Sequence, residues 1–290
     1  MDAVELPVWH AGEITMQTRA GVALRMAEIG PRVLRPYLPA QHRDFYRRLP
    51  FVVLGVADAM GLPIASILMG RPGFVFSPDP MTLRIDALPD PADPLDTALR
   101  PGAKFGLLGI ELPTRRRNRA NGIVTTRDGT GLTLAVEQSF GNCPQYITPR
   151  APAGDPLPVR IEALVVLDAA ADELLARADT LFVASAAPAG VDVSHRGGAP
   201  GFLARDADGA ILLPDYRGNN FFNTLGNLAL NPRIGLAVPD FSSGDLLRIQ
   251  GHAEILLDDR HAVPPHTGRV VRITPTHAAW VRGGAPKTNT

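Results

Sequence analysis

Short apolar segments, interrupted by proline and glycine, recur along most of the chain and predict a protein built mainly from β-strands. Apolar residues at helical spacing predict only a few helices, over residues 12–34, 41–49 and 169–178 and in the second half of residues 211–231. Many short strands with few helices favour a β-barrel architecture. Strands are predicted at residues 51–56, 64–69, 82–85, 105–112, 120–126, 132–137, 181–184, 191–194 and 211–213.

One stretch, residues 211–231, combines a strand, a tight polar turn over residues 214–218 and a helix. Asn219 and Asn220 are predicted to open this helix, since an asparagine side chain can accept from the free N–H groups of a first turn. The helix should end at Asn231, because proline follows and disfavours helical geometry in the residue before it. Three apolar residues would share its buried face: Phe221, Leu225 and Leu228.

Arg217 lies in the turn of this stretch, just before the predicted helix. A helix N-terminus presents unpaired N–H groups, and an arginine beside it favours a phosphate. An ordinary strand-to-helix connection with a solvated arginine would show the same residues. This stretch alone leaves both interpretations open.

The second half of the chain repeats features of the first at a nearly constant distance. The Pro-Gly-Phe of residues 72–74 recurs at 200–202, an offset of 128, and the Gly-Leu of residues 106–107 recurs at 235–236, an offset of 129. Matches of this kind over about fifty residues indicate a tandem duplication of one β-rich unit. The predicted domains are residues 1–150 and 151–290, joined by a proline-rich linker over residues 148–158.

The two copies differ at the turn that carries Arg217. At an offset of 128, residues 215–220 correspond to residues 87–92, which lack the arginine and both asparagines and contain Asp90. The acidic, proline-rich residues 86–94 are predicted to form a loop. Because a carboxylate repels phosphate, this asymmetry favours an anion site that only the second half retains.

Composition and charge exclude several classes of protein. Basic and acidic residues, 29 of each, leave no net charge to attract nucleic acid or an anionic membrane. The single cysteine, Cys143, excludes an internal disulfide and a cysteine-based zinc cluster. No apolar run is long enough to span a bilayer and the first residues lack the pattern of a signal peptide, so we expect a cytoplasmic protein. Arg115, Arg116 and Arg117 are expected to form a solvated turn.

An ordered set of motifs extends over nearly the whole chain and thins after Asp258. In the second half it comprises His195-Arg196, residues 214–220, the NPRIGL of residues 231–236 and the GHA of residues 251–253. Together these resemble the pyridoxamine 5'-phosphate oxidase-like family of split β-barrel flavoproteins. Three further segments resemble its larger, two-copy members: WHAGE at residues 9–13, QHRDF at 41–45 and QSFGNCPQYI at 138–147.

The resemblance implies a mainly β protein with flanking helices, in which tandem FMN-binding split β-barrels form an intrachain pseudo-dimer. Single-copy members are homodimers that bind flavin mononucleotide (FMN) in the cleft between two barrels, so a tandem chain would form this cleft from its own halves. Positions along one strand and the phosphate turn would hold the cofactor, together with a loop from the first half. The implied residues are Asp192, Val193, Ser194, His195, Arg196, Asp215, Arg217, Asn219 and Asn220, with Asn142, Cys143 and Gln145 from the loop.

Two departures from the family pattern bear on function. Family oxidases often have Ser-Arg-Lys at the phosphate turn, where residues 218–220 are Gly-Asn-Asn, so Arg217 would carry more of the charge. Arg272 and Trp280 do not form the motif by which true oxidases recognise pyridoxamine phosphate, and we do not predict oxidation of that compound. Cys143 is expected to be inert packing rather than a reactive thiol.

A flavin supplies its own redox chemistry, so the lack of a conspicuous acid–base pair in the sequence fits a flavoprotein. We expect an FMN-dependent oxidoreductase that passes electrons between a reduced nicotinamide and a small acceptor or oxygen. The alternative is a non-catalytic protein that binds flavin or haem, with His195 as the candidate haem ligand. A deazaflavin would ask for more basic residues than the predicted site offers. The expected partner is a small-molecule substrate or electron donor, and two pseudo-dimeric chains could pair as a homodimer.

Overall fold

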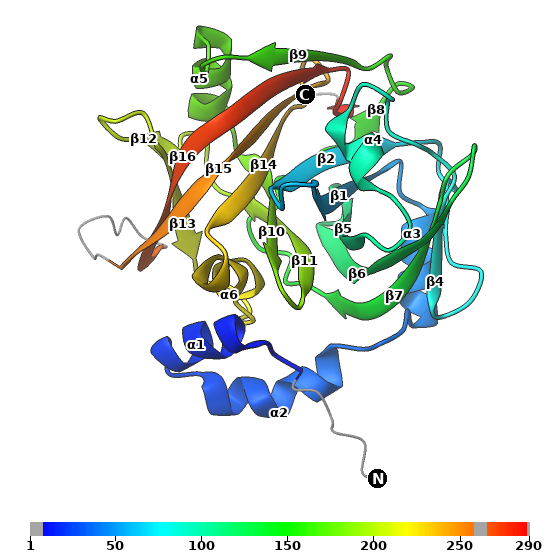
Figure 1. Ribbon diagram of the computed structural model, residues 1–290, viewed down its shortest axis with the longest axis horizontal. Helices are drawn as coiled ribbons and strands as arrows, with labels where there is room; N and C mark the ends of the chain where they lie inside the picture. Colours follow the sequence, from blue (N-terminus) through cyan, green and yellow to red (C-terminus); the bar gives the residue numbers. More distant parts are fainter. Residues whose placement is uncertain (1–7, 258–265, 289–290) are drawn as a thin grey trace.

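Residues 8–257 and 266–288 are described by a computed structural model, which contains two large antiparallel β-sheets (Figure 1). The first sheet has the order β2-β1-β5-β6-β7-β4-β3. Each strand predicted in the first half belongs to it. Its strands are β1 (Phe51–Ala57), β2 (Pro63–Met69), β3 (Val75–Phe76), β4 (Thr82–Ile85), β5 (Lys104–Glu111), β6 (Arg116–Arg127) and β7 (Leu132–Gly141).

The second sheet repeats this order as β11-β10-β14-β15-β16-β13-β12. Outside that path, β9 (Arg160–Leu164) pairs with β16. Because the order of seven strands is the same in both halves, the predicted tandem pair of barrels is confirmed. The second set comprises β10 (Thr180–Ala187), β11 (Gly190–Gly197), β12 (Ala204–Arg205), β13 (Ile211–Tyr216), β14 (Arg233–Asp240), β15 (Asp245–Leu257) and β16 (His266–Arg282).

At the phosphate turn, strand pairing keeps the predicted register of 128 residues between the two halves. Leu83 of β4 pairs with Leu134, and Ile211 of β13 pairs with Ile273; these two partners are equivalent because they lie opposite Val124 and Ala253 in β6 and β15. Burial follows the same register, since Leu83 and Ile85 are buried like Ile211 and Leu213. Continued into the turn, this register makes Pro89 the counterpart of Arg217 and Ala87 that of Asp215, so the first half has lost the arginine.

The two barrels pack against each other through β1, β2 and β5 of the first and β10, β11 and β14 of the second. Glycine permits the close approach: a Cβ at Gly106 would lie 2.7 Å from the carbonyl oxygen of Val191, and one at Gly235 would lie 2.4 Å from that of Pro63. Apolar side chains from both halves form one buried cluster between the sheets. The halves therefore form a pseudo-dimer within one chain.

Two helices, α1 (Ala11–Arg19) and α2 (Ala23–Val33), replace the single helix predicted over residues 12–34. Gly21 interrupts it with a φ of 69°, and this left-handed conformation cannot continue a right-handed helix. α1 packs on α6 (Asn223–Leu230) of the second barrel, where a Cβ at Gly12 would lie 2.0 Å from the carbonyl oxygen of Gly226. Figure 1 shows α1 and α2 lying together below α6.

The start of α6 differs from the prediction, because Asn219 and Asn220 do not open the helix. The N-cap is Phe222, in the left-handed region with a φ of 61°, and it makes no side-chain hydrogen bond. Asn220 is also left-handed, with a φ of 64°, and Asn219 Oδ1 accepts from the N–H of Phe221 at 3.2 Å. Two left-handed residues keep the backbone out of helical geometry until residue 223. The predicted buried face is confirmed for Phe221, Leu225 and Leu228.

The remaining elements are short. α3 (Ala40–Arg47) and α5 (Ala169–Arg177) agree with prediction, and β8 (Pro152–Ala153), inside the predicted linker, pairs with β17 (Lys287–Thr288). The predicted loop at residues 86–94 leads directly into α4 (Pro94–Ala98), which was not predicted. α4 begins 129 residues before α6 and is its counterpart in the duplication.

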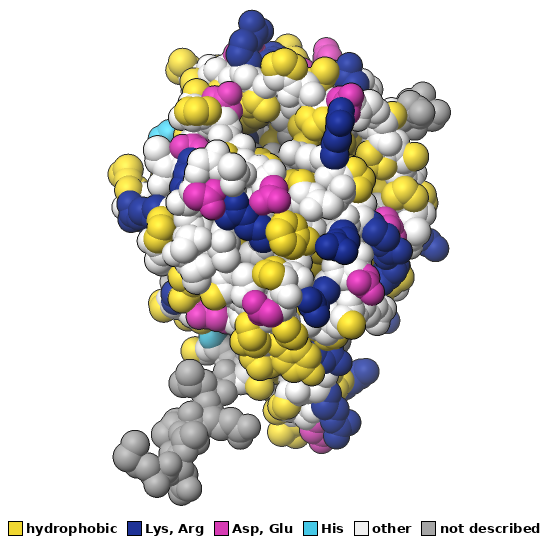
Figure 2. Space-filling view, turned by 90° about the vertical axis from the view of Figure 1, so that its right-hand side faces the viewer, with side chains coloured by type: hydrophobic (Ala, Val, Ile, Leu, Met, Phe, Trp, Pro, Cys, Tyr) yellow, Lys and Arg dark blue, Asp and Glu magenta, His cyan; other side chains and the backbone are white. Residues whose placement is uncertain are grey.

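On the face shown in Figure 2, basic and acidic side chains are interspersed. Over residues 8–257 and 266–288, no helix has both the length and the apolar character needed to cross a membrane.

Candidate cofactor cleft

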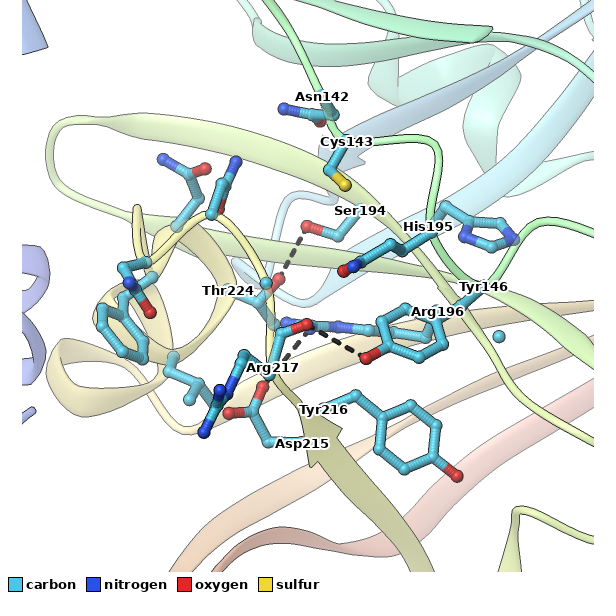
Figure 3. Close-up of a pocket in the computed structure, with 18 of the residues that line it drawn as sticks. Asn142, Cys143, Tyr146, Ser194, His195, Arg196, Asp215, Tyr216, Arg217 and Thr224 are labelled. Carbon is cyan, nitrogen blue, oxygen red and sulfur yellow. Dashed lines mark hydrogen bonds and ion pairs between the residues drawn. The ribbon is translucent and has the colours of Figure 1, made fainter. Parts of the chain in front are cut away.

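A cleft with an empty volume of about 840 Å³ lies where the two barrels meet. The second barrel contributes the ends of β11 and β13 and the connection into α6, and the first contributes β6 and the loop after β7. In Figure 3, Asn142 and Cys143 of that loop lie on the opposite side of the cleft from Asp215 and Tyr216.

The structure brings most of the predicted cofactor residues together in this cleft. Val193 does not line it, because its side chain packs in the core between the barrels against Gly55. Asp192 lines a separate cavity beside α1 instead. The predicted residues that do line the cleft are Ser194, His195, Arg196, Asp215, Arg217, Asn219, Asn220, Asn142, Cys143 and Gln145.

Arginine dominates the charge of the cleft. Among the described residues that line it, the one carboxylate is Asp215. Asp215 accepts from Arg269 Nε at 2.9 Å and from Arg196 Nη1 at 3.4 Å, so its charge is already shared between two cations. The excess of positive charge favours an anionic ligand. The arginines that line the cleft are Arg117, Arg119, Arg196, Arg217 and Arg269.

Arg117 corrects the interpretation of residues 115–117 as a solvated turn. Arg115 is the turn residue, with a φ of 56°, whereas β6 begins at Arg116 and Arg117 lines the cleft. Burial, reinforced by neighbouring arginines, lowers the pKa of Arg117 to about 9, and burial lowers that of Arg119 to about 10. Both stay charged at neutral pH, and their Nε atoms are buried without a hydrogen-bond partner in the described part of the chain. An anion in the cleft would relieve this desolvation.

His195 is buried beside these arginines. Arg117 Nη1 lies 2.9 Å from His195 Nδ1, and a guanidinium can only donate, so Nδ1 accepts and the ring proton is on Nε2. Burial and the charges of the nearby arginines hold the pKa of His195 well below its ordinary value, and the ring is neutral. His195 Nε2 is buried without a partner among the described residues. It therefore offers the cleft one free N–H donor.

The N-terminus of α6 opens on the cleft, and its N-cap Phe222 provides no side-chain acceptor. Polar side chains of the first turn are instead held by neighbouring elements. Thr224 Oγ1 lies 2.7 Å from Ser194 Oγ, and Arg119 Nη1 donates to Asn223 Oδ1 at 3.1 Å. The partial positive charge of an uncapped helix N-terminus adds to that of the arginines.

In the first barrel, a carboxylate side chain of the protein occupies the position equivalent to the cleft at the N-terminus of α6. β15 begins 129 residues after β6, so Arg248 is the counterpart of Arg119. Asp93 caps α4 by accepting from the N–H of Leu95 at 2.8 Å, and Arg248 Nη1 donates to the same Asp93 oxygen at 2.5 Å. Both charged side chains are buried. In the first barrel an internal carboxylate thus joins a helix N-terminus to an arginine. In the second, the N-cap Phe222 offers no carboxylate, and Arg119 Nη1 lies 3.9 Å from Asp192.

Apolar residues in the first barrel replace three polar residues that line the cleft of the second. A register of 129 residues applies to β6 and β15, and strand pairing gives a register of 128 for β2 and β11. The pairs are Arg117 with Leu246, His195 with Ile67 and Arg196 with Leu68. Two arginines of the cleft therefore have apolar counterparts in the first barrel.

A loop from the first half is tied to the phosphate turn of the second. The hydroxyl of Tyr146 donates to the carbonyl oxygen of Arg217 at 3.1 Å, and the rings of Tyr146 and Tyr216 lie with centroids 5.0 Å apart at 33° (Figure 3). The two aromatic rings provide an apolar wall beside the cationic one. A planar ligand with an anionic tail would match both.

Sequence reasoning missed Arg119, Tyr146 and Arg269. Arg119 carried a usable signal, because it recurs as Arg248 in the duplicated half. Tyr146 belongs to a segment singled out for its resemblance to the family. Arg269 had no such signal, since it lies in a strand far along the chain and reaches the cleft only through the pairing of β13 with β16.

A polar chain leads from the cleft to the N-terminal helices. Asn223, which accepts from Arg119, donates through Nδ2 to Glu13 Oε1 at 2.5 Å. Burial, with the charge of Asp192 as the second cause, raises the pKa of Glu13 to about 8 from an ordinary value of 4.5. Glu13 is therefore protonated at neutral pH in the folded protein and ionised in the unfolded chain.

Glu13→Gln is expected to stabilise the protein relative to the parent, and this gain in stability should be larger at alkaline pH than at acid pH. Between the unfolded pKa and the folded pKa the native state binds the extra proton, so Glu13 lowers the free energy of unfolding progressively as pH rises through this window. Unfolding midpoints of variant and parent, measured from about pH 5 to about pH 9, should diverge in favour of the variant and level off above the folded pKa. Two parallel curves would contradict the shifted pKa.

Tandem split β-barrels with a cationic cleft at their junction define the class of this protein. Residues 167–275 match the family described as pyridoxamine 5'-phosphate oxidase. This match confirms, over residues 167–275, the resemblance to the pyridoxamine 5'-phosphate oxidase-like family seen in the sequence. A comparison with curated protein sequences found no match.

Several solved structures are similar to part of the chain. HutZ, the heme storage protein from Vibrio cholerae, is 14% identical, with 41% of this chain and 96% of that chain covered and a TM-score of 0.31. A FAD-binding protein from Mesorhizobium loti is 16% identical, with 43% and 98% covered and a TM-score of 0.30. An F420 reductase is 21% identical, with 38% and 94% covered and a TM-score of 0.28.

Proposed function

We propose that this protein binds one FMN per chain in the cationic cleft and acts as an oxidoreductase. The observation that carries the proposal is the contrast between the two halves of the duplication. In the first barrel Asp93 supplies an anion to a helix N-terminus and to Arg248. In the second barrel the N-cap of the matching helix, Phe222, offers no carboxylate, and Arg119 Nη1 lies 3.9 Å from Asp192, beyond direct hydrogen bonding, so a ligand phosphate is the natural replacement.

The residues present fit such a cofactor. Buried Nε atoms of Arg117 and Arg119 and Nε2 of His195 supply unpartnered donors, and Asn142 Oδ1 supplies an unpartnered acceptor. Arg217 and the first turn of α6 would hold the phosphate, while Tyr146 and neighbouring aromatic groups would cover the ring system. These contacts bind and orient the group and exclude water from one side of it.

When bound, a flavin supplies the electron transfer, and the protein supplies position and electrostatics. Arg117 and Arg119 would stabilise negative charge that develops on a ligand in the cleft, and the N–H of His195 would donate a hydrogen bond to it. A reduced nicotinamide as donor and a small acceptor or oxygen as oxidant complete the proposed reaction. We assign no catalytic acid or base.

The alternatives differ in what they require of the cleft. A haem ligand must present a lone pair, but the contact with Arg117 leaves the proton of His195 on Nε2, which argues against ligation through that atom. A deazaflavin is favoured more than the sequence suggested, because the cleft holds more arginines than the predicted site. A flavin store without catalysis would use the same contacts as an oxidoreductase.

The visible absorption spectrum of the purified protein tests these proposals. We expect the double band of an oxidised flavin, one released FMN per chain and bleaching of the band by a reduced nicotinamide under anaerobic conditions. A Soret band or the single band of a deazaflavin would assign another cofactor. Two flavins per chain would contradict the proposal that only the second half keeps the phosphate site. A bound flavin that no reduced nicotinamide reduces would support cofactor binding but contradict the oxidoreductase.

The oligomeric state, the partner and the location are further parts of the proposal. A pseudo-dimer completes the cleft within one chain, so cofactor binding would not need a second copy, although two chains could still associate as a homodimer. A small-molecule donor or substrate is the proposed partner, and we propose a cytoplasmic location.

A further inference from the structure

A second cavity, with an empty volume of about 1420 Å³, lies between the N-terminal helical segment and the two barrels. It is lined by α1, the connection after α2, β5 to β7, the start of β11 and α6, and it shares no lining residue with the cofactor cleft. The WHAGE segment, singled out in the sequence but unused by the cleft, contributes His10 and Glu13. Asp192, predicted to bind cofactor, also lies here.

One buried polar atom in this cavity has no hydrogen-bond partner among the described residues. Asn121 is 7% exposed; its Nδ2 donates to Asp192 Oδ1 at 2.7 Å, but its Oδ1 is buried and accepts no hydrogen bond from residues 8–257 or 266–288. His10 Nδ1 accepts from the N–H of Gly12 at 3.2 Å, which places the ring proton on Nε2, and Nε2 lies 3.6 Å from Glu13 Oε2. Buried polar atoms are normally paired, so the free oxygen of Asn121 marks a site for a ligand.

Two carboxyl groups line this cavity. Asp192 accepts from Asn121 and, at 3.2 Å, from Asn227, and Arg119 Nη1 lies 3.9 Å from it on the side of the cofactor cleft. Glu13 is 4% exposed and accepts from Asn223 and from the backbone N–H of His10. Asp192 and Glu13 therefore place two acceptor groups beside the same cavity.

Other charged groups that line the cavity are Arg35, Lys104 and Glu137. Lys104 Nζ already donates to the carbonyl oxygens of Pro188 at 2.8 Å and Ala189 at 3.3 Å. The side chain of Glu137 is exposed. Apolar side chains complete the wall and can contact a carbon skeleton: Val8, Leu34, Phe105 and Val191.

We propose that this cavity binds a small organic cation with a planar amidinium or an ammonium group, held by Asp192, Glu13 and the free oxygen of Asn121. Asp192 is paired with Arg119, and Glu13 supplies the second negative charge by losing its proton when the cation enters. The cation makes ionisation favourable at a position where burial otherwise disfavours it. Binding is therefore coupled to release of a proton to solvent.

Benzamidine and its neutral isostere benzamide form a matched pair of probes. Calorimetric titration of the full-length protein near pH 7, in two buffers of different ionisation enthalpy, gives both affinity and proton release. We expect benzamidine to bind at least about tenfold more tightly than benzamide and to release about one proton per chain. Near pH 9, where Glu13 is already ionised, the release should fall towards zero in the same parent protein.

Glu13→Gln should bind benzamidine about tenfold or more weakly and release no proton, whereas the exposed Glu137→Gln should behave as the parent. Equal binding of the two probes, no binding of benzamidine, or proton release that persists in Glu13→Gln would overturn the proposal. The pH series in the parent decides the matter even if Glu13→Gln fails to fold. None of these readouts uses the cofactor, so a protein without flavin would remove the proposed function and leave this inference standing.

Discussion

Replacing Arg117 by leucine is expected to abolish tight cofactor binding while leaving the apoprotein at least as stable as the parent. Leucine is the residue that the duplicated half has at the equivalent position, Leu246, so the substitution suits the barrel. Arg117 has a buried Nε without a partner, and removing such a cation relieves a desolvation cost. The same change removes a charge-assisted contact of roughly 2 kcal/mol from an anionic ligand, or about 30-fold in affinity.

The measurement is a titration of apoprotein with FMN, followed by flavin fluorescence, beside thermal unfolding of the apoprotein. Arg71→Leu is the matched control, since this exposed arginine lies outside the cleft and its loss changes the net charge by the same amount. We expect the control to bind as the parent does. A variant at Arg117 that keeps its affinity, or one that loses it together with stability, would contradict the assigned role.

Asp93→Asn is expected to produce the largest loss of stability of any single charge change in the chain. Arg248 and Asp93 are both buried and directly bonded, and removing one charge leaves the other uncompensated. Breaking a pair of this kind costs about 3–5 kcal/mol, a fall of roughly 5–15 °C in the unfolding midpoint for a domain of this size. Asparagine can still cap α4, so the variant separates charge from capping.

A second substitution tests whether charge is the cause. Adding Arg248→Met to Asp93→Asn removes the stranded cation and should recover most of the lost stability. Asp86→Asn is the control, because its ion pair with Arg84 is exposed and contributes little. A double variant no more stable than Asp93→Asn would mean that packing, rather than the ion pair, holds this region together.

Local patterns predicted much of the fold. Strands such as β1 and β2 are continuous apolar runs bounded by proline and glycine, and a buried sheet imposes that pattern directly. The duplication was visible because each copy must place the same glycine and apolar residues at the same barrel positions. The buried face of α6 followed from its helical spacing for the same reason.

Features that depend on contacts between distant residues were predicted poorly. Asn219 is a good N-cap by composition, yet two left-handed residues postpone the helix, and backbone handedness at non-glycine residues has little sequence signal. Arg117 looks like one of three exposed arginines until strand pairing turns it towards His195 of the other half. Whether an arginine is solvated depends on what packs over it. The residue that contacts Arg117, His195, lies 78 positions further along the chain.

By itself, the sequence determined the class of fold, its tandem duplication, the family resemblance and the loss of Arg217 from one copy, because each is encoded in residues that act locally or in repeated order. Only the tertiary structure decided which residues face the cleft. Packing of β11 against β5 and β6 brought Arg117 and Arg119 of one half to His195 of the other and sent Asp192 to a different cavity. It also placed Asp93 on Arg248, so that the first copy carries its own anion and the second is left to bind one.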